Sequence, residues 1–315
     1  MATRDARVVL VSGAGRFLGA RVAGALAADP TVDRIVGVDT APPVLGQDER
    51  VEYIRADIAH HLIGTVLEQA RVSAVVHTGP SDHRTGLGSL LQSCERSRTV
   101  TRVVLASSSA VYGAARTDPA VCTESTRPAS DLPPGAARNH LATETMAREL
   151  ARRRPDLTIT VLRLAPVLGP SGGGRLARYL TLPLVPVALG FDPRVQVVHE
   201  ADAVAVLAAA ARAERSGIVN VAGPGVLTVG QLVRRAGRLP VPVLAPALRL
   251  TGLDAGWLTH GRVLDTLALG TRFGYQPRFS TEQAVAAFAA ARASRVRLAP
   301  ALLSAAERAV TGNAG

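Results

Sequence analysis

Short runs of Val, Ile, Leu and Ala alternate with longer stretches of helical periodicity over the first half of the chain. Short apolar runs bounded by turn residues are typical of buried strands in a parallel sheet, and helices between them form the crossover connections. The predicted strands are Val8–Val11, Ile35–Val38, Ala74–His77, Val103–Ala106 and Thr158–Arg163, and the predicted helices are Gly19–Ala28, Ile58–Arg71, Leu87–Ser97 and Ala136–Arg153. This alternation predicts an α/β fold built on a doubly wound parallel sheet.

The pattern changes after residue 165. Residues 166–193 are rich in Pro and Gly, which predicts loops and short elements over a binding face. Strands are then expected at Val195–Val198 and Ile218–Val221, on either side of an alanine-rich helix at Ala201–Ala213. Residues 230–315 predict a small helical lobe. We therefore expect a sheet domain at 1–165 to which 195–222 return, and a smaller mixed C-terminal lobe on the substrate side at 166–194 and 223–315.

Arginine supplies every one of the 36 basic residues, because the sequence contains no lysine. This excludes lysine Schiff-base chemistry, a phosphate-loop lysine and a Tyr-x-x-x-Lys dyad. The net charge of +11 could attract polyanions, but the arginines are scattered and aromatic residues make up only 3% of the chain. We expect no nucleic-acid partner.

The two cysteines, Cys94 and Cys122, are too far apart in the sequence for a metal motif and too few for a disulfide framework. No apolar tract reaches the roughly 20 residues that a membrane-spanning helix needs. The N-terminal residues are predicted to form the first strand and not a leader peptide. These features favour a cytoplasmic protein without a metal site or a membrane span.

A glycine-rich turn follows the first predicted strand and precedes the first predicted helix. It places Gly13, Gly15 and Gly19 where a backbone must approach a pyrophosphate closely, and a helix N-terminus favours anionic groups. Asp39 ends the second strand and is positioned to accept hydrogen bonds from an adenosine ribose. Its charge would repel a 2′-phosphate. The spacing predicts a Rossmann-type site for NAD, with NADP less favoured.

Together with this loop, several later motifs resemble the extended short-chain dehydrogenases/reductases of the NAD-dependent epimerase/dehydratase family. The resemblance is narrower to actinobacterial proteins of the UDP-glucose 4-epimerase-like type, in which Arg-Phe-Leu-Gly closes the loop. The later motifs are Arg55-Ala56-Asp57-Ile58, Val75-Val76-His77, Ser107-Ser108-Ser109-Ala110-Val111-Tyr112-Gly113, Leu162-Arg163-Leu164, Val198-His199-Glu200-Ala201-Asp202, Asn220-Val221-Ala222-Gly223 and Gly274-Tyr275-Gln276-Pro277.

The resemblance implies a set of cofactor-binding residues. One of them departs from the family pattern, since Arg16 stands where the middle glycine of the phosphate loop is usual. Arg16 could pair with phosphate oxygens or could fill the groove and weaken cofactor binding. The implied residues are Gly13, Gly15, Arg16, Phe17, Leu18, Gly19, Asp39, Asp57, Ile58 and His77.

The implied catalytic residues depart further. Aligning the helix ahead of the Arg152–Arg154 run puts the family's lysine at Arg138 and its tyrosine at Pro134. Arg138 is expected to contact the nicotinamide ribose but not to act as a base, since its pKa is too high. Ser108 matches the serine that bonds the reacting hydroxyl, and Tyr179 is a candidate for a recruited acid.

His140, two residues beyond Arg138, is rotated by roughly 200° from the face of Arg138 and is interpreted as a surface histidine.

The resemblance implies a small-molecule substrate of the nucleotide-sugar type, with Arg194 and Arg262 as candidate ligands of its diphosphate. The family's dimers imply a homodimer through the helices Leu87–Ser97 and Ala136–Arg153.

Two functions stay open: an atypical NAD-dependent epimerase, dehydratase or reductase, and a non-catalytic NAD-binding sensor or partner subunit. A degenerate protein that binds nothing is argued against by Asp39 and Asp57.

Overall fold

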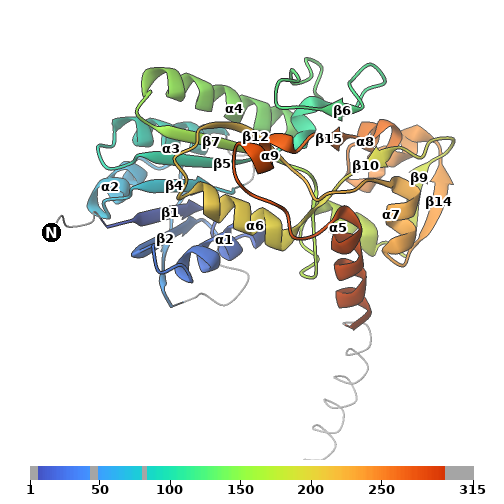
Figure 1. Cartoon of the computed structure of the whole chain (residues 1–315), viewed down its shortest axis with the longest axis horizontal. Coiled ribbons are helices and arrows are strands. Elements are labelled where there is room, and N and C mark those ends of the chain that lie inside the picture. Colours follow the sequence, from blue (N-terminus) through green and yellow to red (C-terminus); the bar gives the residue numbers. More distant parts are fainter. Residues whose placement is uncertain (1–5, 43–48, 80–83, 295–315) are drawn as a thin grey trace, which may run out of the picture.

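A computed structural model describes residues 6–42, 49–79 and 84–294. Its centre is a seven-stranded sheet with all neighbouring strands parallel, in the order β12-β7-β5-β4-β1-β2-β3 (Figure 1). The strands are β1 (Val8–Ser12), β2 (Arg34–Asp39), β3 (Val51–Arg55), β4 (Ala74–His77), β5 (Arg102–Ser108), β7 (Thr158–Leu164) and β12 (Gly217–Val221). The predicted α/β fold with a doubly wound parallel sheet is confirmed.

Helices cover both faces of this sheet. One face packs on α1 (Phe17–Ala27) and α6 (Glu200–Ala210), and the other on α2 (Leu62–Gln69), α3 (Arg84–Arg96) and α4 (Ala136–Arg153). All five residues of β1 are buried, as expected for a central parallel strand that is covered on both sides. The predicted helix at Ala136–Arg153 is confirmed residue for residue.

Smaller elements form a second group with its own buried core, at the right of Figure 1. It contains four two-stranded pairings, of which three are parallel and one is antiparallel. Residues 281–294 are also helical. The remaining strands are β6 (Val121–Cys122), β8 (Val167–Leu168), β9 (Leu184–Ala188), β10 (Arg194–Val195), β11 (Val198–His199), β13 (Leu227–Thr228), β14 (Leu239–Val243) and β15 (Val263–Leu264). The remaining helices are η1 (Ser109–Tyr112), α5 (Gly174–Thr181), α7 (Val229–Arg235), η2 (Ala245–Thr251), α8 (Ala255–His260) and α9 (Leu267–Thr271).

Three sequence predictions need correction. The strand predicted at Val195–Val198 is wrong, because the chain there splits into β10 and β11, which pair outside the large sheet. Between them, the Gln196 side chain accepts a hydrogen bond from the backbone N–H of Leu264 at 2.7 Å, which ties the segment to the second group. The edge strand β3 was not predicted, and the region from 230 onward contains β14 and β15 beside its helices.

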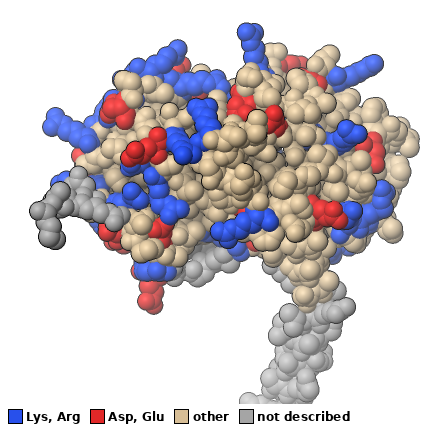
Figure 2. Space-filling view, in the orientation of Figure 1, with Lys and Arg blue, Asp and Glu red and all other residues tan. Residues whose placement is uncertain are grey.

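Within the described residues, none of the helices combines the length and the apolar character needed to cross a bilayer. Figure 2 shows basic and acidic side chains interspersed over the face in view, without a single field of one sign.

Candidate functional site

Two adjoining cavities lie along the carboxyl edge of the sheet, where the strand order reverses between β1 and β4. In open α/β sheets this edge is the usual place for a ligand. The larger cavity has a volume of about 430 Å³, and the smaller one is a narrow cleft between the ends of β1 and β2. Both are lined by Gly79, so the two cavities adjoin at this residue.

The glycine turn after β1 is built by close backbone contacts. Gly13 has φ of +83°, and a Cβ there would lie 2.6 Å from the backbone nitrogen of Gly79. A Cβ on Gly15 would collide with the carbonyl oxygen of Ala41, and one on Gly19 would collide with the carbonyl oxygen of Gly13. These three positions therefore admit only glycine, and they keep the N-terminus of α1 open to a bound group.

Asp39 lies at the end of β2, and its buried carboxylate is held by backbone N–H groups. It accepts hydrogen bonds from Gly15 at 3.1 Å and from Thr40 at 2.7 Å. The Arg16 Nε lies 3.7 Å from Oδ2 of Asp39, while the Arg16 side chain stays 46% exposed. Arg16 is therefore placed beside the carboxylate that the sequence assigns to the adenosine ribose.

The other residues predicted to bind a cofactor are brought to the same edge. Asp57, Ile58 and His77 line the narrow cleft with Asp39. Phe17 and Leu18 line the larger cavity. The buried His77 ring shares a hydrogen bond of 2.8 Å with the Ser12 hydroxyl, which fixes its orientation.

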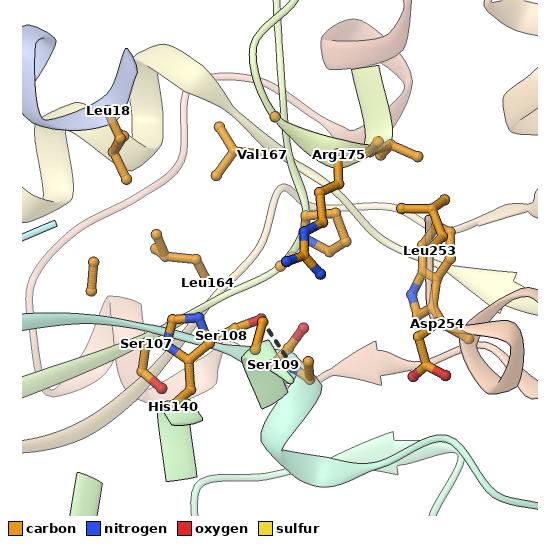
Figure 3. Close-up of a pocket in the computed structure, with 18 of the residues that line it drawn as sticks. Leu18, Ser107, Ser108, Ser109, His140, Leu164, Val167, Arg175, Leu253 and Asp254 are labelled. Carbon is orange, nitrogen blue, oxygen red and sulfur yellow. Dashed lines mark hydrogen bonds between the residues drawn. The ribbon is translucent and has the colours of Figure 1, made fainter. Parts of the chain in front are cut away.

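Ser108 is the last residue of β5 and lines the larger cavity. Its Oγ accepts a hydrogen bond from the backbone N–H of Ala110 at 3.2 Å, drawn as a dashed line in Figure 3. Tyr112, four residues later, points elsewhere: its hydroxyl donates to Oδ1 of Asn220 at 2.7 Å, and burial raises its pKa. Ser108 therefore presents its hydroxyl to the cavity, whereas Tyr112 is structural.

Helix α4 is held against the sheet by a buried carboxylate. Glu144 accepts a hydrogen bond from the Ser107 hydroxyl at 2.7 Å and two from the Arg163 guanidinium, at 3.0 Å and 2.6 Å. Residues four apart share one face of a helix. Ala136 and His140, which lie eight and four residues before Glu144, accordingly line the larger cavity.

The interpretation of His140 as a surface residue is therefore wrong. Arg138 is the outward-facing residue of this turn: it is exposed, and its Nε donates to the carbonyl oxygen of Leu132 at 3.0 Å. Neither Arg138 nor the exposed Pro134, which precedes α4, is among the residues that line the cavity. The spacing of His140, Glu144 and the buried Ala147 was the signal in the sequence that marked the inward face.

Tyr179, the candidate acid, lies on α5 with its side chain in the core of the second group. Its hydroxyl donates to the carbonyl oxygen of Pro186 at 2.6 Å, and burial raises its pKa. It is not among the residues that line the cavity.

Two arginines face the larger cavity from the second group. Arg262 is buried, donates through Nε to the carbonyl oxygen of Gly113 at 2.7 Å, and lies 3.9 Å from Asp254. Burial lowers its pKa. Arg175, which the sequence analysis did not single out, is the second residue of α5 and directly follows three glycines. Figure 3 shows its guanidinium pointing into the cavity. Arg194 is exposed and does not line the cavity.

The rest of the cavity wall is mainly apolar. Among the described residues that line it there is no tyrosine, and the described part of the chain contains no cluster of three His, Cys, Asp or Glu side chains that could hold a metal ion. The apolar lining includes Leu18, Leu164, Pro166, Val167, Leu176, Leu253 and Trp257.

Residues 9–222 match the NAD dependent epimerase/dehydratase family. An uncharacterized protein of Mycobacterium tuberculosis (strain ATCC 25618 / H37Rv) is 36% identical over 310 residues, which covers 88% of this chain and 82% of that protein.

Two solved structures share the fold. A UDP-glucose 4-epimerase of Thermotoga maritima, solved with UDP-glucose, has a TM-score of 0.75 at 18% identity, with 92% of this chain and 99% of that chain covered. A dTDP-glucose 4,6-dehydratase of Bacillus anthracis, solved with NAD, has a TM-score of 0.76 at 15% identity, with 92% and 97% covered.

Proposed function

The chain belongs to the NAD-dependent epimerase/dehydratase family, and from that premise we propose that it binds NAD along the carboxyl edge of the sheet and acts on a small molecule in the adjoining cavity. The observation that carries this proposal is that the two cavities adjoin. A cleft that ends at Asp39 joins, at Gly79, a cavity that contains Ser108. A dinucleotide and its substrate need such an extended site.

The residues around the cleft fit the two halves of the dinucleotide. The crowded glycine turn leaves the N–H groups at the start of α1 for the pyrophosphate, and Asp39 suits the adenosine ribose hydroxyls. Its charge favours NAD over NADP. Bound NAD would supply a hydride acceptor, and Ser108 would orient the reacting hydroxyl by a hydrogen bond.

We place a nucleotide-sugar first among the substrate classes. Arg175 and Arg262 bring two cations to one cavity, and guanidinium groups suit a diphosphate. Two of the solved structures with this fold contain a UDP-sugar, UDP-glucose in one and UDP-glucuronic acid in the other.

The test begins with the purified protein. Mass spectrometry and absorbance report whether NAD(H) co-purifies, and isothermal titration measures the affinity for NAD and NADP. The NAD-loaded protein is then exposed to UDP-glucose, UDP-glucuronic acid and dTDP-glucose while absorbance at the wavelength of NADH is followed. Gly19→Ala is the matched binding variant: its methyl group would collide with the carbonyl oxygen of Gly13 in the glycine turn, so we expect it to lose affinity for the dinucleotide. Failure of the wild-type protein to bind either dinucleotide would overturn the proposal.

A second candidate is a non-catalytic NAD-binding sensor or partner subunit. It is favoured by the absence of tyrosine from the described residues that line the cavity. In this case the bound cofactor keeps its redox state on exposure to every sugar nucleotide and to a metabolite extract. A change in redox state would exclude it.

We also propose a homodimer in which α3 and α4 of each subunit form a four-helix bundle. Light scattering after size-exclusion chromatography gives the mass in solution. A monomer at all concentrations would contradict this assembly.

A further inference from the structure

A histidine on α4 faces the cavity at the place where the carboxyl end of β5 presents Ser108. Figure 3 shows the His140 ring directed from α4 toward the segment labelled Ser107 and Ser108. We propose that His140 is the acid–base residue of this site and that it exchanges the proton which accompanies hydride transfer. The inference deepens the proposed function and rests on NAD occupying the cleft.

The buried hydrogen bond between Ser107 and Glu144 fixes the position of His140 along the direction of strand β5. Strand β5 runs toward the cavity, and α4 runs back from it, so a residue one turn earlier on α4 lies closer to the cavity. One turn is about 5.4 Å of rise, more than the roughly 3.3 Å between neighbouring strand residues, so His140 lies beyond the level of the strand end at Ser108. Ala136, one further turn away, has a side chain without any acid–base group.

Among the polar residues of this wall other than His140, only Asp254 carries an acid–base group, and its carboxylate lies 3.9 Å from the Arg262 guanidinium. An imidazole exchanges a proton near neutral pH, whereas an unactivated serine is a poor base and an arginine does not deprotonate. When a substrate alcohol is oxidised, bound NAD would supply the acceptor for the hydride of the C–H bond. The neutral imidazole of His140 would accept the proton of the O–H bond, so that the alcohol becomes a carbonyl group. In the reverse direction His140 would return this proton to the oxygen.

The charges around His140 come from every element that packs on α4 or borders the cavity. On the side of the sheet Glu144 is neutralised by Arg163, and at the far end of α4 the Glu95 of α3 is paired with Arg153. The titratable side chain of η1 is Tyr112, whose hydroxyl donates a hydrogen bond to Asn220. Across the cavity stand Arg175, Asp254 and Arg262. Of these side chains, Arg175 and Arg262 bring positive charge to the cavity and Asp254 brings negative charge.

The test does not depend on knowing the substrate. The affinities for NAD⁺ and for NADH are measured by titration from about pH 8 to about pH 5.5, the range in which histidine titrates. Oxidised nicotinamide carries a positive charge and reduced nicotinamide does not. An imidazolium beside the ring should therefore weaken NAD⁺ binding roughly tenfold across this range and leave NADH binding nearly constant.

The matched variants are His140→Asn, which removes the titrating group, and Thr145→Ala, an exposed change on the same helix. We expect His140→Asn to bind NAD⁺ with little pH dependence and Thr145→Ala to behave as the wild type. If the wild type shows no pH dependence, or His140→Asn keeps it, the inference is overturned while the proposed function stands. If the wild type binds neither dinucleotide at any pH, the proposed function fails first.

Turnover supplies the second measurement. With UDP-glucose as the probe, formation of NADH should speed up as the pH rises through the histidine range, and His140→Asn should slow it by about 10²–10⁴-fold. An unchanged rate in His140→Asn would overturn the assignment.

Discussion

Replacement of Glu144 by glutamine would test the buried ion pair that sets the position of α4. Glu144 and Arg163 are almost fully buried, and their side chains meet at 3.0 Å and 2.6 Å. Glu144→Gln keeps the size of the side chain but leaves the guanidinium without a counter-charge. Arg163 also makes a cation–π contact, with its Cζ 4.6 Å from the centroid of the Tyr112 ring, but this contact does not replace a carboxylate.

The expected magnitude follows from the cost of an uncompensated buried charge. Removal of one partner of a buried pair costs about 3–5 kcal/mol, a large part of the roughly 5–15 kcal/mol by which a folded protein is stable. Arg163→Met also leaves a buried charge, that of Glu144, but it should lose less because Arg148 stays 3.2 Å from Oε2 of Glu144. The double variant Glu144→Gln/Arg163→Met should be more stable than the sum of the two single losses predicts.

Urea unfolding followed by far-ultraviolet circular dichroism gives the free energy of unfolding of all four proteins. The exposed pair Glu95–Arg153 supplies the control, and Glu95→Gln should have a far smaller effect because solvent screens it. A Glu144→Gln protein as stable as the wild type, or strictly additive losses in the double variant, would refute the argument.

Three further predictions concern single side chains. Arg16→Gly should weaken NADP binding more than NAD binding in isothermal titration, since the guanidinium lies 3.7 Å from Asp39; equal losses would place it at the shared pyrophosphate instead. Burial lowers the pKa of His199, whose Nδ1 accepts a hydrogen bond from the backbone N–H of Ala201 in the first turn of α6, so the folded state resists protonation. The stability that the neutral form of His199 provides is complete above a pH of about 6.5 and is lost as the pH falls through the lower folded-state pKa. His199→Asn keeps a capping oxygen and should flatten this part of the plot of urea midpoint against pH. An unaltered plot would contradict the assignment. Tyr179→Phe should lower the free energy of unfolding in urea by about 1 kcal/mol and leave NAD affinity unchanged, because it loses one hydrogen bond outside the cavity. Weakened NAD binding would show that this tyrosine contributes to the site.

The sequence by itself determined most strands of the sheet and the glycine turn that follows β1. Strands β1, β2, β4, β5 and β7 follow from apolar runs that are buried on both faces, and the glycine turn follows from the strand, loop and helix around it. Asp39 could be placed because it ends a strand whose neighbour is β1. Each of these inferences uses residues close together in the chain, where local pattern and structure agree.

Only the tertiary structure decided which residues line the cavity. The inward face of α4 is chosen by Glu144, whose partners Ser107 and Arg163 lie 37 and 19 residues away in the chain. The prediction from the sequence takes the face of Arg138 as the inward face of the helix, and for this reason it wrongly places His140 on the surface. The hydrogen bond of Tyr179, the exposure of Arg194 and the approach of Arg175 to the cavity depend on how the second group of elements packs on the sheet edge. Periodicity shows that a helix has an inward face, but contacts between distant segments determine which residues occupy it.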